Sequence, residues 1–198
     1  AKQSGTMQGE IAAEVIRADP AVDRNADGKI QYVLLEGETG HQDAIIRTDS
    51  VVRTIQGQGI YLEKLSYQFA NWNRSQAENK MLQLIHQYGD DIELVLCNND
   101  EMAMGAVDAY EDEGYSLEER PAFFGIDGLD GTLEAVKNGI IQGTVFNDRQ
   151  GQAEQIARLA TDLFKGNALS GYDFVNERYI FLPYQKVTIS NVDTFMNR

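Results

Sequence analysis

Oxygen-bearing groups recur at alternate positions of the segment 23–31, which runs directly into an apolar stretch. The oxygen donors that this spacing offers to a single ion are Asp23, Asn25, Asp27, the backbone carbonyl of Lys29, and Gln31. Gly28 follows the third donor and permits the sharp turn that such a loop needs. Calcium is a hard cation that prefers about six to eight oxygen ligands. The segment therefore predicts a calcium-binding loop.

The pattern matches the first nine positions of the calcium loop found between paired helices, and then departs from it. The twelfth position of that loop is a bidentate Glu, but the residue here is Leu34. Residues 30–35 have the sequence of a strand, so the missing carboxylate has to come from a distant part of the chain. An acidic turn without an ion is the alternative, because Asp, Asn and Gly favour turns.

Hydrophobic periodicity predicts strands that alternate with helices at a spacing of roughly 30 residues. The predicted helices are 8–17, 41–56, 73–88, 100–111, 129–137 and 152–164. The predicted strands are 30–35, 60–69, 92–97, 122–126 and 142–146, and β-rich residues close the chain at 179–189. This alternation is typical of an α/β fold in which a parallel sheet is flanked by helices on both faces.

Polar or aromatic groups follow every one of the five predicted strands. In chain order they are His41, Asp43 and Arg47, then Trp72, then Asn98, Asn99 and Asp100, then Asp127, and finally Asn147 and Asp148. In open α/β sheets, ligands bind beyond the carboxyl ends of the strands. Their recurrence at successive strand ends therefore favours one shared binding site.

These side chains suit a neutral ligand with many hydroxyls. Sugar hydroxyls both donate and accept hydrogen bonds, and planar Asp, Asn and Arg groups bind adjacent hydroxyls in pairs. The apolar face of Trp72, the only tryptophan, would cover the C–H side of a pyranose ring. The structural alternatives are helix caps for Asp100 and Asp148, and a core position for the tryptophan. Asp43 and Arg47 would alternatively form a surface ion pair.

The composition excludes several classes of partner. The 198 residues include 17 basic and 31 acidic ones, for a net charge of −14, so a phosphate backbone would be repelled and no nucleic acid is expected. No apolar run approaches the roughly 18 residues of a membrane helix, so no direct membrane insertion is expected. The single cysteine, Cys97, lies in an apolar strand and is expected to be buried. The chain shows no signal peptide, and its abrupt beginning at Ala1 suggests a natural start further upstream.

Enzyme chemistry is not expected. His41 and Asp43 are too close in sequence for a catalytic triad, and no serine follows a strand in a turn before a helix. His86 lies within a predicted helix and is expected to be structural or exposed. The segment 125–128 lacks the third glycine and the lysine of a phosphate-binding loop.

Four stretches carry more specific motifs: DRNADGKIQYVLL at 23–35, GHQDA at 40–44, NND with MAMGA at 98–106, and GTV with ND at 143–148. With them, the chain resembles the periplasmic galactose/glucose-binding proteins, the sugar receptors of bacterial ABC uptake and chemotaxis. The resemblance runs from about Ser4 to Tyr184. Gln42 stands where this family usually has proline, which affects the backbone more than the chemistry.

The resemblance implies a structural Ca²⁺ ion in the loop at 23–31, and it supplies the missing carboxylate as Glu93. It also implies contacts to galactose or glucose from the strand ends, namely His41, Asp43, Arg47, Trp72, Asn99, Asp127 and Asn147. The implied partners are a membrane ABC permease and a chemoreceptor. The implied location is extracytoplasmic, in the periplasm or on the surface of a Gram-positive cell.

Two other functions stay open at this point. One is the effector-binding core of a repressor with a similar fold, since fold alone does not fix function. The calcium loop and the lack of a basic helix–turn–helix argue against it. The other is a calcium-stabilised scaffold that binds no sugar.

Members of the resembled family have two lobes that close on the sugar, and this chain departs from them in length. The resemblance assigns 1–147 to a sugar- and calcium-binding domain like the C-terminal lobe, 148–183 to a crossover resembling part of the other lobe, and 184–198 to the return. The main body of the first lobe, with an Asp and an aromatic ring for the other sugar face, is missing. The crossover would then lack a partner for its apolar side chains, which include Ile156, Leu159, Leu163 and Phe164. The chain is accordingly expected to be a fragment, or to rearrange or self-associate so that this surface is covered.

Overall fold

A parallel sheet lies at the centre of the computed structural model, which describes residues 1–196. Strand β1 (Ile30–Glu36) pairs in parallel with β2 (Leu62–Phe69) and β3 (Leu94–Cys97), and β4 (Ala122–Phe124) pairs in parallel with β3. The strand order is β2-β1-β3-β4. Every residue of β1 is buried, as expected for a strand covered on both faces, whereas no residue of the edge strand β2 is fully buried.

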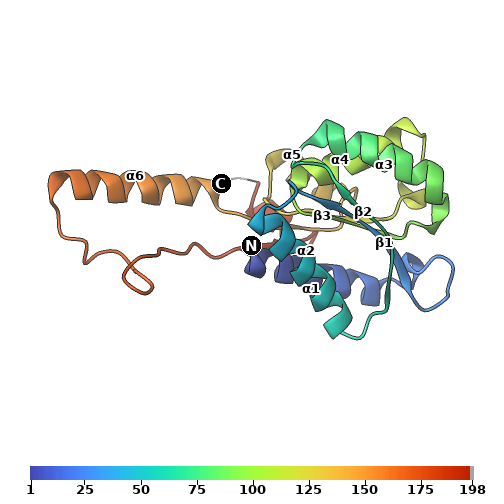
Figure 1. Cartoon of the computed structure of the whole chain (residues 1–198), viewed down its shortest axis with the longest axis horizontal. Coiled ribbons are helices and arrows are strands. Elements are labelled where there is room, and N and C mark those ends of the chain that lie inside the picture. The colour runs from blue at the N-terminus through green and yellow to red at the C-terminus, as the bar shows by residue number, and fades with distance from the viewer. Residues whose placement is uncertain (197–198) are drawn as a thin grey trace. The chain divides into compact units, whose positions relative to one another are not determined.

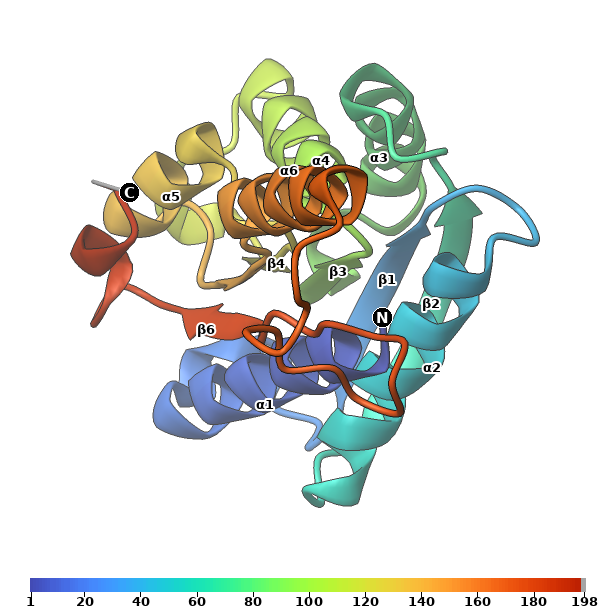
Figure 2. The same cartoon turned by 90° about the vertical axis from the view of Figure 1, so that its left-hand side faces the viewer.

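Helices cover both faces of this sheet (Figure 1, Figure 2). On one face, α1 (Lys2–Ala18) packs against α2 (Gln42–Gly57). On the other face, α3 (Arg74–Tyr88) packs against α4 (Asp100–Asp112), and α5 (Asp130–Lys137) lies beside α4. The predicted fold class, an α/β fold with a parallel sheet flanked by helices on both faces, is confirmed.

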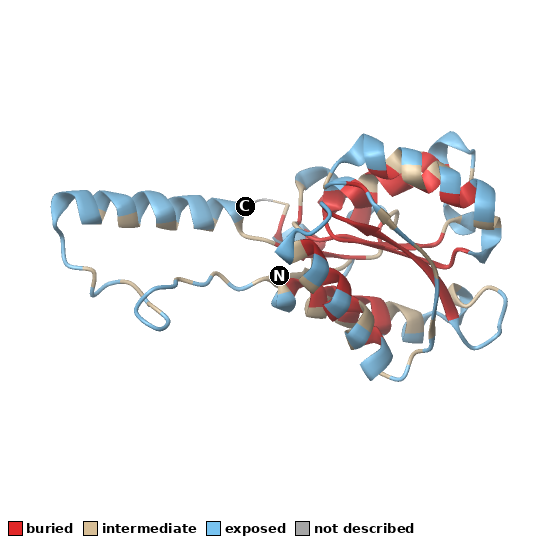
Figure 3. Ribbon diagram, in the orientation of Figure 1, coloured by how far each residue is buried: buried red, intermediate tan, exposed pale blue. Residues whose placement is uncertain are grey.

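The hydrophobic core lies between the sheet and the helices, where the ribbon of Figure 3 is coloured as buried. Strand residues such as Val33 and Phe123 pack there with Met81 of α3 and Met102 of α4. Cys97 is buried and free, as predicted. Burial raises the pKa of its thiol far above the usual range, which makes this side chain an inert apolar group.

Helix α1 begins at Lys2, six residues before the predicted start at residue 8. The prediction began too late because Gly5 is a poor helix former. Gly5 and Gly9 both serve close packing: a β-carbon on Gly5 would lie 2.7 Å from the Arg47 carbonyl oxygen, and one on Gly9 would lie 2.7 Å from Cβ of Thr54. The two glycines therefore let α1 approach α2 closely.

The β-rich stretch that closes the chain forms a strand only in part. Within the β-rich stretch 179–189, only β6 (Gln185–Val187) forms a strand, and it pairs antiparallel with β5 (Thr144–Phe146). Two parallel bridges, Phe124 to Gly143 and Asp127 to Phe146, continue the main sheet toward β5. Strand propensity is realised only where a neighbouring strand offers a ladder, which accounts for the shorter strand.

The chain divides into two compact units, Ala1–Phe146 with Gln185–Arg198, and Asn147–Tyr184. The second unit contains helix α6 (Arg149–Lys165), whose first turn is capped by Asp148 accepting a hydrogen bond from the Gly151 nitrogen at 2.9 Å. No residue of α6 is buried, and the side chain of Phe164 is 93% exposed. The last two residues of the predicted return segment 184–198 lie outside the described part of the chain.

Across residues 1–196, no helix combines the length and the apolar character that crossing a lipid bilayer requires.

Candidate functional site

Side chains from three strand ends meet around Trp72, at the carboxyl edge of the parallel sheet. The His41 ring lies edge-on to the indole, with ring centroids 5.2 Å apart, and Cζ of Arg47 lies 5.8 Å from the indole centroid. Asn99 donates a hydrogen bond from Nδ2 to the Trp72 carbonyl at 3.3 Å. Residues that follow β1, β2 and β3 are thus gathered in one place, as the parallel topology requires.

Arg47 connects this group to the end of β4. Its guanidinium Nη1 donates to the Asn98 carbonyl at 2.7 Å, and Nη2 lies 3.9 Å from Oδ1 of Asp127. Arg47 is 6% exposed, and within the described structure its buried Nε has no hydrogen-bond partner. Buried donors without a partner are uncommon, and a ligand or water oxygen at this point would satisfy it.

The backbone is held in an uncommon conformation at two of the candidate contacts. Trp72 has a φ of 61°, Asn71 before it has 51°, and Asp127 has 135°. Such values in non-glycine residues cost on the order of 1–3 kcal/mol each and persist only where the surroundings enforce them. Strained residues gather at ligand sites, so their presence supports a binding role for this edge.

His41 and Asp43 start helix α2. His41 is the N-cap, and its Nδ1 accepts a hydrogen bond from the Asp43 nitrogen at 3.2 Å, which leaves Nε2 as the proton-bearing ring atom. Asp43 lies in the first helical turn, where the helix dipole favours a negative charge. The two residues are close in sequence because both belong to the start of this helix.

Asn99 has the capping role that the sequence suggested for Asp100. Asn99, not Asp100, is the N-cap of α4, with Oδ1 accepting from the Met102 nitrogen at 3.1 Å. Asp100 is fully buried, and its carboxylate accepts hydrogen bonds from Thr144 Oγ1 at 2.6 Å and from the Leu129 nitrogen at 2.9 Å. Burial raises the pKa of Asp100 to about 7, against the lowering effect of these hydrogen bonds. Asp100 is therefore a structural tie between α4, β5 and the start of α5.

Asn147 directly follows β5 in the chain and is the first residue of the second unit. Its Oδ1 accepts a hydrogen bond from Nε2 of Gln152 at 2.6 Å. Side-chain and backbone contacts join five of the seven predicted sugar contacts, namely His41, Arg47, Trp72, Asn99 and Asp127. Asp43 is tied to them through His41.

The predicted calcium loop lies at the opposite edge of the sheet, just before β1. Its side chains fold back on its own backbone: Asp23 accepts from the nitrogens of Asp27 and Gly28, and Asn25 accepts from the nitrogen of Asp27. Asp27 accepts from the Lys29 nitrogen at 2.8 Å. Left-handed values at Ala26 and Gly28, with φ of 56° and 80°, produce the tight turn.

Glu93 reaches this loop from the residue before β3. Its Oε1 accepts from the nitrogens of Arg24 at 2.7 Å and Asn25 at 3.3 Å, and its Oε2 accepts from the Gln31 nitrogen at 2.9 Å. Glu93 is 1% exposed, and burial raises its pKa above the usual carboxyl value, against the lowering effect of these three backbone donors.

The residues fit a hard cation by chemistry, because all the expected ligand atoms are oxygens and Glu93 reaches the loop that carries the others. Over the described residues, however, no group of three or more His, Cys, Asp or Glu side chains forms a metal cluster. Half of the expected ligands are amides or a backbone carbonyl, and the Glu93 oxygens face backbone N–H groups. To bind an ion, the Glu93 carboxylate would have to give up part of its hydrogen bonding to these N–H groups.

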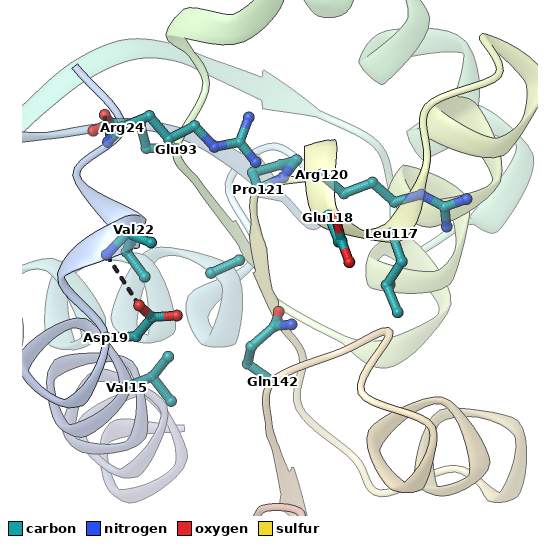
Figure 4. A pocket seen from close by; sticks show the side chains of 12 residues that line it. Val15, Asp19, Val22, Arg24, Glu93, Leu117, Glu118, Arg120, Pro121 and Gln142 are labelled. Carbon is teal, nitrogen blue, oxygen red and sulfur yellow. Dashed lines mark hydrogen bonds between the residues drawn. The ribbon is translucent and has the colours of Figure 1, made fainter.

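A pocket of about 220 Å³ lies beside Glu93 and Arg24 (Figure 4). Two polar side chains in its wall are already bonded within the chain. Gln142 accepts from the Phe123 nitrogen and donates to the Gly139 carbonyl, and Arg120 donates to the Tyr115 carbonyl. The Gln142 amide and the Arg120 guanidinium are therefore already used by the fold.

Sequence reasoning missed the residues that hold the carboxyl edge together. Gln8 of α1 is 1% exposed and donates from Nε2 to the carbonyls of Cys97, Phe124 and Gly125. Asn98 is one of a polar triplet in the sequence, but it bonds to Gly37 after β1 and to Arg47 and Thr48 of α2. No pattern in the sequence distinguishes such buried amides from exposed ones.

The model of a family described as "Periplasmic binding protein domain" matches residues 1–168. The chain is 36% identical over 198 residues to the D-galactose/methyl-galactoside binding periplasmic protein MglB of Haemophilus influenzae, covering 98% of this chain and 59% of that protein. It is 35% identical over 175 residues to a putative rhizopine-binding protein of Rhizobium meliloti, covering 87% and 53%. The chain thus spans less than two thirds of the length of these relatives.

Solved structures show the same fold. An ABC transporter solute binding protein from Bacillus halodurans C-125 with bound myo-inositol aligns with a TM-score of 0.80 and 30% identity, covering 98% of this chain and 60% of that one. A periplasmic solute binding protein from Actinobacillus succinogenes 130z with bound D-allose aligns with a TM-score of 0.77 and 22% identity, covering 98% and 61%. These relatives are binding proteins rather than enzymes.

Proposed function

This chain belongs to the periplasmic binding protein family, and from that membership we propose that it is the sugar-binding lobe of an extracytoplasmic receptor. The proposed ligand is a monosaccharide, galactose or glucose. One relative is named for galactose, and two solved relatives hold myo-inositol and D-allose. All of these ligands are compact molecules rich in hydroxyls, which the side chains at the carboxyl edge are chemically suited to bind.

The observation that carries the proposal is the convergence of Arg47, Trp72 and Asp127 from three separate strand ends. A guanidinium and a carboxylate bind neighbouring hydroxyls in pairs, and an indole face covers the apolar side of a sugar ring. Arg47 also keeps a buried Nε that would gain an acceptor from a bound hydroxyl. Together these groups favour a sugar over a charged or purely apolar ligand.

The proposal extends to an ion and to partners. The loop at 23–31 and Glu93 would hold a structural Ca²⁺ ion, which would stabilise the edge of the sheet opposite the sugar. A membrane ABC permease is the proposed partner, because the solved relatives are ABC transporter solute binding proteins. A chemoreceptor is proposed as a second partner by analogy with galactose/glucose receptors.

A titration followed through Trp72 tests the sugar assignment, because this is the only tryptophan and its emission reports the site alone. Galactose, glucose and myo-inositol are the probes, and glycerol is a control that has hydroxyls but no ring. We expect a saturable change for at least one hexose, with a dissociation constant in about the millimolar range, since one lobe leaves a sugar face open to water. The assignment fails if no ring compound changes the emission at about 50 mM, or if glycerol acts equally.

A further inference from the structure

Asn98 is buried at the carboxyl end of β3, one residue before the candidate contact Asn99, and is 1% exposed. Its Oδ1 accepts a hydrogen bond from the Gly37 nitrogen at 3.1 Å, and its Nδ2 donates to Thr48 Oγ1 at 3.1 Å. Its backbone carbonyl accepts a hydrogen bond from Nη1 of Arg47 at 2.7 Å. One buried residue at the end of β3 thus joins the segment that follows β1 to helix α2.

Gly37, which Asn98 holds, lies directly against the indole of Trp72. A β-carbon on Gly37 would fall 2.2 Å from Cζ2, 2.3 Å from Cε2 and 2.5 Å from Cη2 of that ring. Real β-carbons essentially never approach other atoms within 3.0 Å. Only glycine at this position therefore allows the ring its observed place.

The backbone of Trp72 is also held in place. Asn71 and Trp72 both have left-handed φ values, a conformation that surrounding contacts must enforce. Asn99 supplies one such contact, through its hydrogen bond to the Trp72 carbonyl. The indole is thus held by its contact with Gly37, and the Trp72 backbone is held by Asn99.

We propose that Asn98 and Gly37 are positioning residues that fix the Trp72 indole relative to the Arg47 guanidinium. Asn98 orients Arg47 through its carbonyl and places Gly37 through its side chain, and Gly37 in turn seats the ring. The consequence for affinity rests on the proposed sugar-binding function. The placement of the ring itself does not depend on any ligand.

The test compares Gly37→Ala and Asn98→Leu with the unmodified chain. The control is Gln142→Leu, which removes a half-buried amide bonded to the backbone at the opposite edge of the sheet (Figure 4). Acrylamide quenching and emission of Trp72 are measured without sugar, and sugar affinity is measured by calorimetry. Circular dichroism and the thermal midpoint establish that each variant is folded.

We expect Gly37→Ala and Asn98→Leu to expose the ring to acrylamide and to weaken sugar binding by about tenfold. Gln142→Leu is expected to change neither property. Asn98→Asp keeps the acceptor for Gly37, so the ring should be quenched as in the unmodified chain, which separates seating of the ring from loss of stability.

Quenching and affinity that remain unchanged in both Gly37→Ala and Asn98→Leu would overturn the proposal, as would equal effects in Gln142→Leu. If one of these two variants does not fold, the other decides by the same criterion. If neither folds, Asn98→Ala, which removes the same acceptor for Gly37 without adding bulk, decides by the same criterion. If the unmodified chain binds no sugar, the proposed function fails, while the ligand-free quenching comparison still decides the positioning role.

Discussion

The carboxylate of Glu93 lies 2.7 Å from the backbone nitrogen of Arg24, although 69 residues separate the two in the chain. Parallel pairing of β1 with β3 creates this proximity, because the start of β3 is carried next to the start of β1. A loop that lacks its own twelfth-position carboxylate thus has one within reach.

From this arrangement we expect calcium to stabilise the chain. An ion that binds only the folded state adds about 2.7 kcal/mol at a concentration of 100 times its dissociation constant. For a domain of this size, that corresponds to a rise in the thermal midpoint of about 5–10 °C. The midpoint is measured by calorimetry with added calcium and with EGTA, and equal midpoints would remove the metal from the proposal.

Two substitutions should act like chelation, namely Asp27→Ala in the loop and Glu93→Gln beside it. Each removes an expected oxygen ligand, so each should reduce or abolish the response to calcium. Glu118→Gln is the control, because Glu118 is an acidic and exposed residue in the wall of the neighbouring pocket. A calcium response that survives in Glu93→Gln would exclude this residue as a ligand.

The sequence was sufficient to predict the sheet because β1 and β3 are nearly unbroken apolar runs between helices with clear periodicity. It was also sufficient to place His41, Trp72 and Asp127 at one edge, since parallel strands all present their carboxyl ends there.

What could not be predicted depends on contacts distant in sequence. Gly37 has no distinguishing neighbours in sequence, yet the indole of Trp72 packs on it. Asp100 resembles a helix cap by position, but its distance of 2.6 Å to Thr144 Oγ1 follows from how β5 approaches α4. Such pairings arise from packing, which local propensity does not encode.

Arg47→Lys should weaken sugar binding although the charge is kept. Arg47 reaches the Asn98 carbonyl and the Asp127 carboxylate with two different nitrogens, a fork that one ammonium group does not reproduce. We expect a loss of about tenfold in affinity, measured by calorimetry. Arg53→Lys is the matched control on the same helix, because the Arg53 side chain is 78% exposed and its pair with Asp49 is worth little. Equal affinities for Arg47→Lys and Arg53→Lys would contradict the assigned role.

Asp100 should make stability depend on pH. Burial raises its pKa from the usual 3.8 to about 7, so between these values the folded chain binds more protons than the unfolded chain. The free energy of unfolding therefore falls as pH rises through this window. The stabilisation that protonated Asp100 contributes is fully present only below the unfolded-state pKa. The advantage of the unmodified chain over Asp100→Asn in urea unfolding should accordingly shrink from pH 4 to pH 8. Asp112→Asn, at an exposed position of the same helix, should show no such trend, and a trend of equal size there would refute the assignment.

Gln8→Leu should destabilise the carboxyl edge of the sheet, although an apolar side chain is usually tolerated at a buried position. The Gln8 amide donates to the carbonyls of Cys97 at 2.8 Å and Phe124 at 3.1 Å, at the ends of β3 and β4. Leucine would leave these buried acceptors without that donor, at a cost of about 1–3 kcal/mol. The thermal midpoint should fall by about 2–4 °C for each kcal/mol, and sugar affinity should fall with it because the strand ends carry the site. Gln3→Leu, on an exposed position of the same helix, is the control, and a midpoint for Gln8→Leu equal to that of Gln3→Leu would show that this amide does not secure the strands.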